Sequence, residues 1–207
     1  MLTQEEWMGA LNARHGKERQ EKFSRAVVCG LGGLGSNVAI ALARAGIGKL
    51  ILIDFDRVDV TNLNRQQYKA SQLGMNKTEA LAQNLREINP FIRLETHAVR
   101  ISEENAQELL QEADVVCEAF DVPEAKAMLV NFVLENMPEK YLVAGSGMAG
   151  FGSPNTIQTR RITGRFYLCG DTVSDVNDGI GLVCARVMVC AAHEAHTILR
   201  LLANEIE

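Results

Sequence analysis

A glycine-rich run at residues 29–37 is the first segment whose residue types could do chemistry. Gly30, Gly32 and Gly35 have the GxGxxG spacing, Gly33 lies inside it, and an apolar stretch precedes them. This spacing predicts a tight turn from a buried strand into a helix, where backbone N–H groups face an anion at the helix N-terminus. The run therefore predicts a nucleotide phosphate site, but by itself it does not say which nucleotide.

Polar side chains follow the next apolar strand at closely spaced positions: Asp54, Asp56, Asn62, Arg65, Gln66 and, after a break at Gly74, Lys77. Asp54 stands where an acid would bond the ribose hydroxyls. Glycines and a helix dipole are enough to neutralise the pyrophosphate of a nicotinamide cofactor, which rarely needs so many further charged side chains. Their presence here favours a nucleoside triphosphate as the ligand. We expect Arg65 and Lys77 to hold the beta and gamma phosphates, the first by its planar fork and the second as a point charge. A solvated loop is the alternative interpretation.

Asp121 ends another apolar stretch, residues 114–120, which we expect to be a strand. The carboxyl edge of an open parallel sheet is where ligands bind, so this carboxylate is a candidate site residue. The alternative is a helix N-cap, because Pro123 follows two positions later.

The elements that must position these residues alternate along the chain. Thr3 and Glu6 form a capping box for a helix within residues 1–23. Strands separated by helices then predict an α/β, Rossmann-like, doubly wound fold with a mainly parallel sheet. Two consecutive strands at 155–162 and 164–169 predict an antiparallel hairpin at the sheet edge. Helices are expected at 71–88, 103–112, 123–136 and, as a long C-terminal helix, 179–203.

The composition is that of a globular protein with one sizeable core: 207 residues, 47% apolar and 23% charged. We therefore expect a single domain over residues 1–207. A net charge of −5 argues against a nucleic-acid partner, because binding to a phosphate backbone needs clustered cations. No apolar run approaches the roughly twenty residues of a membrane span, and the charged N-terminus does not have the pattern of a signal peptide. We expect a cytoplasmic protein whose five cysteines are reduced thiols.

The segments GLGGLGSN, DFDRVDVTNLNRQ and GMNK resemble the ThiF/MoeB/HesA adenylyltransferases, which are relatives of the ubiquitin-activating enzymes. The resemblance covers about residues 25–202 and is nearest to the short ThiF type. It implies adenylation, with Mg-ATP, of the C-terminal Gly-Gly carboxylate of a small ubiquitin-like sulfur carrier protein. A thiocarboxylate for thiamine synthesis or a related pathway would follow, with sulfur from a separate donor.

The resemblance also implies roles for two further residues. An acid matching Asp121 coordinates the Mg²⁺ that bridges the ATP phosphates in the family, which fits the preference of Mg²⁺ for few carboxylates and phosphate oxygens. The N-terminal helix supplies an arginine to the phosphates of the partner protomer. Arg14 is the nearest match, Arg19 could serve instead, and a homodimer is implied.

The chain departs from the family in its cysteines. Many members hold a structural zinc with two CxxC pairs, whereas this chain has a lone Cys169 and no such pair, so we expect no zinc. Cys184 and Cys169 are candidates for sulfur transfer, but helical periodicity places Cys184 against the core, where thiols are usually inert. Four glycines within residues 145–153 could let a Gly-Gly tail approach closely, or could simply form turns.

Three other functions remain open from the sequence. A hydride-transferring, NAD-dependent oxidoreductase shares the glycine turn and Asp54, but it leaves Asn62, Arg65 and Lys77 without a task. A related adenylyltransferase could act on another carboxylate, that of a molybdopterin carrier or a modified tRNA. A non-catalytic carrier-binding module is disfavoured, because Asp54, Arg65, Lys77 and Asp121 are all present.

Overall fold

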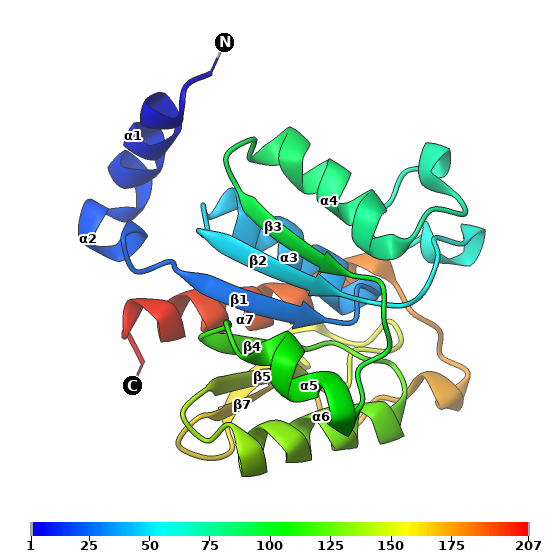
Figure 1. Cartoon of the computed structure of the whole chain (residues 1–207). Coiled ribbons are helices and arrows are strands. Elements are labelled where there is room, and N and C mark those ends of the chain that lie inside the picture. The colour runs from blue at the N-terminus through cyan, green and yellow to red at the C-terminus, as the bar shows by residue number, and fades with distance from the viewer. Residues whose placement is uncertain (1, 207) are drawn as a thin grey trace.

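A seven-stranded sheet forms the middle layer of the computed structural model, which describes residues 2–206 (Figure 1). Its strand order is β3-β2-β1-β4-β5-β7-β6. All neighbouring strands are parallel except β6 and β7, which form an antiparallel pair at one edge. The strands are β1 (Arg25–Cys29), β2 (Lys49–Ile53), β3 (Arg93–His97), β4 (Val115–Glu118), β5 (Tyr141–Gly145), β6 (Gln158–Arg161) and β7 (Phe166–Gly170).

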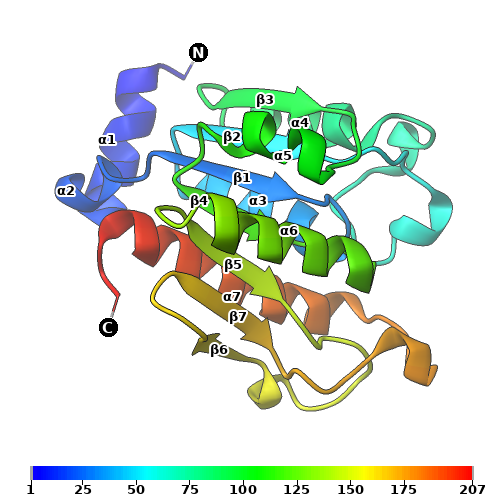
Figure 2. The ribbon, with the colours of Figure 1, turned by 60° about the horizontal axis from the view of Figure 1, so that its bottom comes forward.

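Helices cover both faces of the sheet (Figure 2). On one face lie α3 (Gly33–Arg44), α4 (Lys77–Ile88) and α7 (Cys184–Ala203), and on the other lie α5 (Glu103–Leu110) and α6 (Pro123–Asn136). Two short N-terminal helices, α1 (Gln4–His15) and α2 (Lys17–Gln20), pack beside the starts of β1 and β2 (Figures 1 and 2). None of the described helices is long and apolar enough to cross a membrane.

The strands bury side chains on both faces, which is why they are almost continuously apolar. Along β1, Val28 packs into the cluster formed with α3, α4 and α7, whereas Val27 and Cys29 pack into the cluster formed with α5 and α6. Each fully buried Val or Leu side chain contributes about 1.5–3 kcal/mol. Two apolar cores on a shared sheet therefore hold the strand ends in fixed positions.

The predicted fold class is confirmed, including the antiparallel edge hairpin and the long C-terminal helix. The chain winds outward from β1 in both directions, so the strand order reverses between β1 and β4. In open α/β sheets a crevice forms at such a switch point, beyond the carboxyl ends of the strands. The glycine turn after β1 and Asp121 after β4 both lie at this edge.

Three predicted helices have boundaries that differ from the observed ones by more than two residues. The N-terminal helix expected within residues 1–23 is broken at Gly16, whose φ of +84° is incompatible with a continuous right-handed helix. The helix expected from residue 71 begins only at Lys77, after Gly74 at φ +83°. The C-terminal helix begins at Cys184 instead of residue 179, because Gly179 and the residues after it form a turn.

Candidate nucleotide site

The glycine turn connects β1 to α3 with little room for side chains. Gly30 has φ +86°, and a Cβ atom there would lie 2.8 Å from the carbonyl oxygen of Ala119. A Cβ atom on Gly35 would lie 1.8 Å from the carbonyl oxygen of Gly30. Gly32 is the N-cap of α3 and Gly33 its first residue, and no side chain caps this helix end. The N–H groups of the first turn are thus available to an anion.

Asp54 is buried at the end of β2 and holds the glycine turn. Its Oδ2 accepts the N–H of Leu31 at 2.6 Å, and its Oδ1 accepts the N–H of Asp56 at 2.7 Å. Burial raises the pKa of the Asp54 carboxyl, although nearby Lys77 and these two N–H groups favour its charged form. Each carboxylate oxygen of Asp54 can accept a second hydrogen bond, so the carboxylate could also accept one from a ribose hydroxyl. The contact between Asp54 and the ribose stays a prediction.

Lys77 and Asp56 come together at the start of α4. The Lys77 Nζ lies 2.8 Å from Asp56 Oδ2, and the Lys77 N–H donates to the Asp56 carbonyl at 2.9 Å. The Lys77 side chain is only 7% exposed, whereas that of Asp56 is 48% exposed. A buried ammonium needs an ionised partner, so Asp56 holds Lys77 in place at the sheet edge.

Arg65 lies across the start of α3. A Cβ atom on Gly33 would be 3.4 Å from Arg65 Cγ, and the Arg65 guanidinium donates to the Thr61 carbonyl and to Asn64 Oδ1. Asn62 has a local structural task, because its Oδ1 accepts the N–H of Asp59. The aliphatic part of the Arg65 side chain therefore lies against the uncapped N-terminus of α3, and its guanidinium is held by the loop that carries it.

Gln66 carries an unsatisfied acceptor beside the same turn. Its Oε1 is buried and has no hydrogen-bond partner among the described residues, and its Nε2 would lie 3.8 Å from a Cβ atom on Gly32. An unpaired buried carbonyl costs about 1–3 kcal/mol. A ligand with a hydrogen-bond donor at this position would remove that penalty, which fits nucleotide binding.

Asp121 is exposed beyond the end of β4. The N-cap of α6 is Val122, and no side chain caps that helix, so the alternative of Asp121 as an N-cap is wrong. Asp121 forms no hydrogen bond or ion pair with the residues that the structure describes. Its carboxylate is therefore free to bind a cation at the switch point.

Lys126 is a further cation at this edge that was not predicted from the sequence. Its Nζ pairs with Glu118 Oε2 and donates to the Gly145 carbonyl at 2.8 Å. Glu118 is fully buried, and its other oxygen accepts the N–H of Phe120. The sequence held one signal for this pair, an acid inside the apolar stretch 114–120. A buried carboxylate needs a cationic partner, so a lysine or arginine was to be expected near it.

The two candidate N-terminal arginines differ in their surroundings. Arg19 Nε donates to Glu205 at 2.8 Å, and its Nη1 donates to the His15 carbonyl. Arg14 is exposed in the last turn of α1 and forms no hydrogen bond or ion pair with residues 2–206. Arg14 is thus the freer of the two.

The N-terminal helices lie at the far end of α3 from the glycine turn. Gln20 Nε2 donates to the Gly46 carbonyl, and a Cβ atom on Gly46 would meet Leu11 Cδ1 at 2.2 Å. Gly46 follows the last turn of α3, which is 12 residues or roughly 18 Å long. The helices α1 and α2, which carry these arginines, therefore lie at the end of the sheet opposite to the glycine turn of their own chain (Figure 1).

The two candidate cysteines also differ in position. Cys169 is buried in β7, and burial raises the pKa of its thiol to about 12. Cys184 is the first residue of α7 and is partly exposed, with Sγ 3.7 Å from Met188 Sδ. The expected placement of Cys184 in the core is wrong, because the helix begins at this residue and leaves its side chain at the end.

Gly147, within the glycine-rich segment 145–153, packs closely against another part of the same chain. A Cβ atom on Gly147 would lie 2.1 Å from Asp171 Oδ1, and the N–H of Asp171 donates to the Gly147 carbonyl. Gly170 packs in the same way against the Ser146 carbonyl, 1.8 Å from its Cβ position. These contacts join the segment after β5 to the segment after β7.

Glu194 is a fully buried acid on α7 with neither carboxyl oxygen hydrogen-bonded within the described structure. A Cβ atom on Gly145 would lie 2.9 Å from its Oε1. Burial raises the pKa of Glu194 well above its ordinary value, with Glu118 adding to the shift and Lys126 opposing it. The folded state thus keeps a proton that the unfolded state releases once the pH exceeds the ordinary carboxyl pKa of 4.5.

Replacing Glu194 with Gln is expected to raise the free energy of unfolding at pH 8 by about 1 kcal/mol or more, with little change at pH 5. The sign follows from linkage, because a raised carboxyl pKa makes the native state lose stability as the pH rises above the unfolded value. Urea unfolding at both pH values measures this, with exposed Glu104→Gln as the control. Equal destabilisation by Glu194→Gln at both pH values would mean that Glu194 is ionised and paired.

Within residues 2–206, no three His, Cys, Asp or Glu side chains gather so that they could hold a metal ion. The expectation of no zinc stays a prediction.

Comparison with known proteins gives one family and a consistent fold. The family described as "ThiF family" matches residues 10–205. "Adenylyltransferase and sulfurtransferase UBA4" of Lodderomyces elongisporus is 34% identical over 201 residues, covering 92% of this chain and 43% of that protein. "Sulfur carrier protein adenylyltransferase" of Thermus thermophilus is 38% identical over 131 residues, covering 62% of this chain and 43% of that protein. The chain thus spans less than half the length of these curated relatives.

A solved structure covers nearly the whole chain. The crystal structure of E. coli tRNA N6-threonylcarbamoyladenosine dehydratase, TcdA, in complex with AMP superposes with a TM-score of 0.85 at 25% identity. The superposition covers 99% of this chain and 98% of that one.

Proposed function

The chain belongs to the ThiF family, as its sequence motifs indicated, and from that premise we propose that it adenylates the C-terminal Gly-Gly carboxylate of a small ubiquitin-like sulfur carrier protein. ATP is the co-substrate and pyrophosphate is released. The observation that carries the proposal is the placement of Arg65 across the uncapped N-terminus of α3, beside the unsatisfied Gln66 carbonyl. The names of the relatives support an adenylyltransferase reaction.

The reaction requires two anions to meet. The carrier carboxylate is ionised at neutral pH, so its attack on the alpha phosphate needs no general base. Catalysis then consists of neutralising the phosphate charge and aligning the attack. The N–H groups of the first turn of α3, with Arg65 and Lys77, would supply the positive field. An oxygen–phosphorus bond forms to the carboxylate, and the bond to the pyrophosphate leaving group breaks.

The free carboxylate of Asp121 suits Mg²⁺ and would hold this ion near the phosphates. The positive charge of the ion would then add to the field of the cations. Asp54 and Gln66 would contact the nucleoside, with Gly30, Gly32, Gly33 and Gly35 forming the cradle. Asp56 acts by holding Lys77, and Asn62 by shaping the loop that carries Arg65.

Residues 1–207 act as a single ThiF-type domain, and the active form is a homodimer in which Arg14 of one protomer reaches the phosphates of the other. Thiamine biosynthesis is the proposed pathway, and the proposed compartment is the cytoplasm, where the five free cysteines would stay reduced. A molybdopterin carrier remains an alternative acceptor.

A modified tRNA carboxylate is the second candidate acceptor. One observation favours it: the chain superposes on almost all of TcdA, whereas it spans 43% of the matched curated relatives. The net charge of −5 weighs against a nucleic-acid partner.

ATP–pyrophosphate exchange tests both candidates. We expect exchange only when Mg²⁺ and a small ubiquitin-like protein ending in Gly-Gly are present. The same carrier lacking its last two glycines is the control, and bulk tRNA is the competing acceptor. Exchange without any acceptor, or with tRNA alone, would contradict the proposal, as would a thermal shift with NAD and none with ATP.

A further inference from the structure

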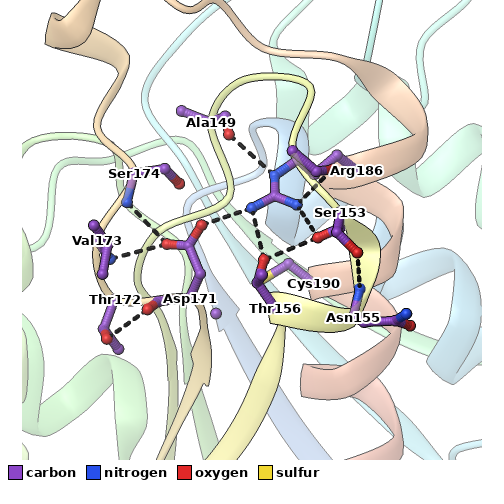
Figure 3. Close-up of polar contacts among 12 residues, drawn as sticks. Ala149, Ser153, Asn155, Thr156, Asp171, Thr172, Val173, Ser174, Arg186 and Cys190 are labelled. Atoms are coloured by element: carbon purple, nitrogen blue, oxygen red, sulfur yellow. Dashed lines mark hydrogen bonds and ion pairs between the residues drawn. The ribbon is translucent and has the colours of Figure 1, made fainter.

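Arg186, in the first turn of α7, makes five hydrogen bonds although its side chain is only 7% exposed. Four go to the segment after β5: Nε to the Ala149 carbonyl, Nη1 to the Gly152 and Ser153 carbonyls, and Nη2 to Thr156 Oγ1. The fifth joins Nη2 to Asp171 Oδ2 at 2.6 Å, in the segment after β7 (Figure 3). One guanidinium therefore ties two loops to one helix.

Asp171 connects the Arg186 guanidinium to the turn at residues 171–174. Its Oδ1 accepts the N–H groups of Val173 and Ser174, both at 2.9 Å, so the carboxylate shapes the turn that it begins (Figure 3). Thr172 inside this turn has φ +63°, which is unusual for a residue with a side chain. Burial opposes ionisation, yet the N–H groups of Ser174 and Val173 and the Arg186 guanidinium together lower the pKa of Asp171. The ion pair thus fixes a strained turn.

The same two loops reach the nucleotide site. We call residues 146–156 and 171–182 the clamped loops. The N–H of Gly150 donates to the Gly181 carbonyl at 2.8 Å, and Asn64 Nδ2 donates to the Leu182 carbonyl at 3.1 Å, at the end of the second loop. Asn64 Oδ1 in turn accepts from Arg65. A continuous set of contacts therefore joins Arg186 to the loop that carries Arg65.

Besides the Arg186 contacts, backbone hydrogen bonds from Asp171 to Gly147 and from Thr172 to Ser146 join the clamped loops, which have little regular secondary structure. They contain only two short 3₁₀ helices, η3 (Pro154–Thr156) and η4 (Val176–Asp178). Four of their large apolar side chains face solvent: Phe151 is 89% exposed, Val173 83%, Val176 50% and Ile180 47%. Exposed apolar side chains beside a site are typical of a surface that meets a protein partner.

We propose that the Arg186–Asp171 pair is a positioning device that fixes the clamped loops beside the nucleotide site, so that they receive the protein acceptor and align its C-terminus. This inference rests on the proposed function, and neither residue is expected to touch ATP. The pair joins the two loops by charge and hydrogen bonds.

Asp171→Asn tests this, with Asp114→Asn as the matched control, because Asp114 also pairs with an arginine, Arg25, but at an exposed position. We expect Asp171→Asn to raise the KM for the acceptor at least tenfold and to leave the equilibrium Kd for ATP within twofold. Amide hydrogen exchange should become at least tenfold faster at Val173 and Ser174, and stay unchanged in β1 and α3. If Asp171→Asn does not fold, Arg186→Lys carries the test, because it keeps the charge but loses the fork.

The two proposals fail in different ways. If the wild-type chain shows no acceptor-dependent exchange, the proposed function is wrong, and the hydrogen-exchange and ATP-binding measurements still decide whether the pair fixes the loops. Unchanged hydrogen exchange in both variants would overturn the positioning role. So would an unchanged acceptor KM in an enzyme that is active, or a loss of ATP affinity equal to the loss of acceptor affinity.

Discussion

Lys77→Ala and Arg65→Ala are each expected to lower kcat/KM for acceptor adenylation by about a hundredfold or more, equivalent to about 2.7 kcal/mol of transition-state stabilisation. Negative charge develops on the leaving pyrophosphate, and fixed cations stabilise it more strongly in a partly buried site than in water. The structure supports this for Lys77, whose side chain is 7% exposed and held by Asp56 at 2.8 Å. Steady-state kinetics of ATP–pyrophosphate exchange, measured with saturating Mg²⁺, give the ratio of the wild-type and variant kcat/KM values.

Lys69→Ala is the matched control for Lys77. Lys69 also forms a short lysine–carboxylate pair, with Glu87 at 2.6 Å, but it lies at an exposed position and is not a candidate site residue. Thermal unfolding of all variants separates loss of folding from loss of catalysis. A decrease of tenfold or less in Lys77→Ala, or an equal decrease in Lys69→Ala, would show that Lys77 is a structural residue.

Arg14→Ala and Asp121→Ala proteins are each expected to be nearly inactive alone, and to regain about a quarter of wild-type activity when mixed in equal amounts. Random subunit exchange makes half of the dimers mixed, and each mixed dimer has one intact site of its two. The physical reason is distance: α1 packs at the end of α3 opposite to the glycine turn, so Arg14 cannot serve its own site.

Arg19→Ala is the control for Arg14, because Arg19 is engaged with Glu205 and the His15 carbonyl. We expect it to keep most of the wild-type activity. Co-purification of differently tagged subunits shows whether exchange has taken place. If no activity returns although exchange is demonstrated, Arg14 does not act across a dimer interface.

The local parts of the site could be predicted from the sequence because they depend on residues close together in the chain. The spacing of Gly30, Gly32 and Gly35 requires a tight turn into α3, and the alternating apolar segments require a sheet with helices on both faces. Helix ends were less predictable. A glycine can continue a helix or end it, and only the backbone φ at Gly16 and Gly74 shows which.

Long-range partners were decided by the tertiary structure alone. Lys126 lies at the sheet edge because it pairs with the buried Glu118 at the end of β4. Asp121 is not a helix cap, because α6 begins at Pro123 with Val122 as its N-cap. Gln66 was predicted as a site residue, but its unsatisfied carbonyl depends on what packs around it.

The sequence by itself determined the glycine turn into α3, the doubly wound fold and the family, because these follow from short-range spacing and from apolar periodicity. The tertiary structure alone decided that Arg186 would clamp residues 149–156 to Asp171, and that α1 would lie far from its own nucleotide site. An arginine in a helix has many polar groups within reach of its fork. Which of them it binds depends on where β5 and β7 bring their loops, and the packing of the whole sheet sets that position.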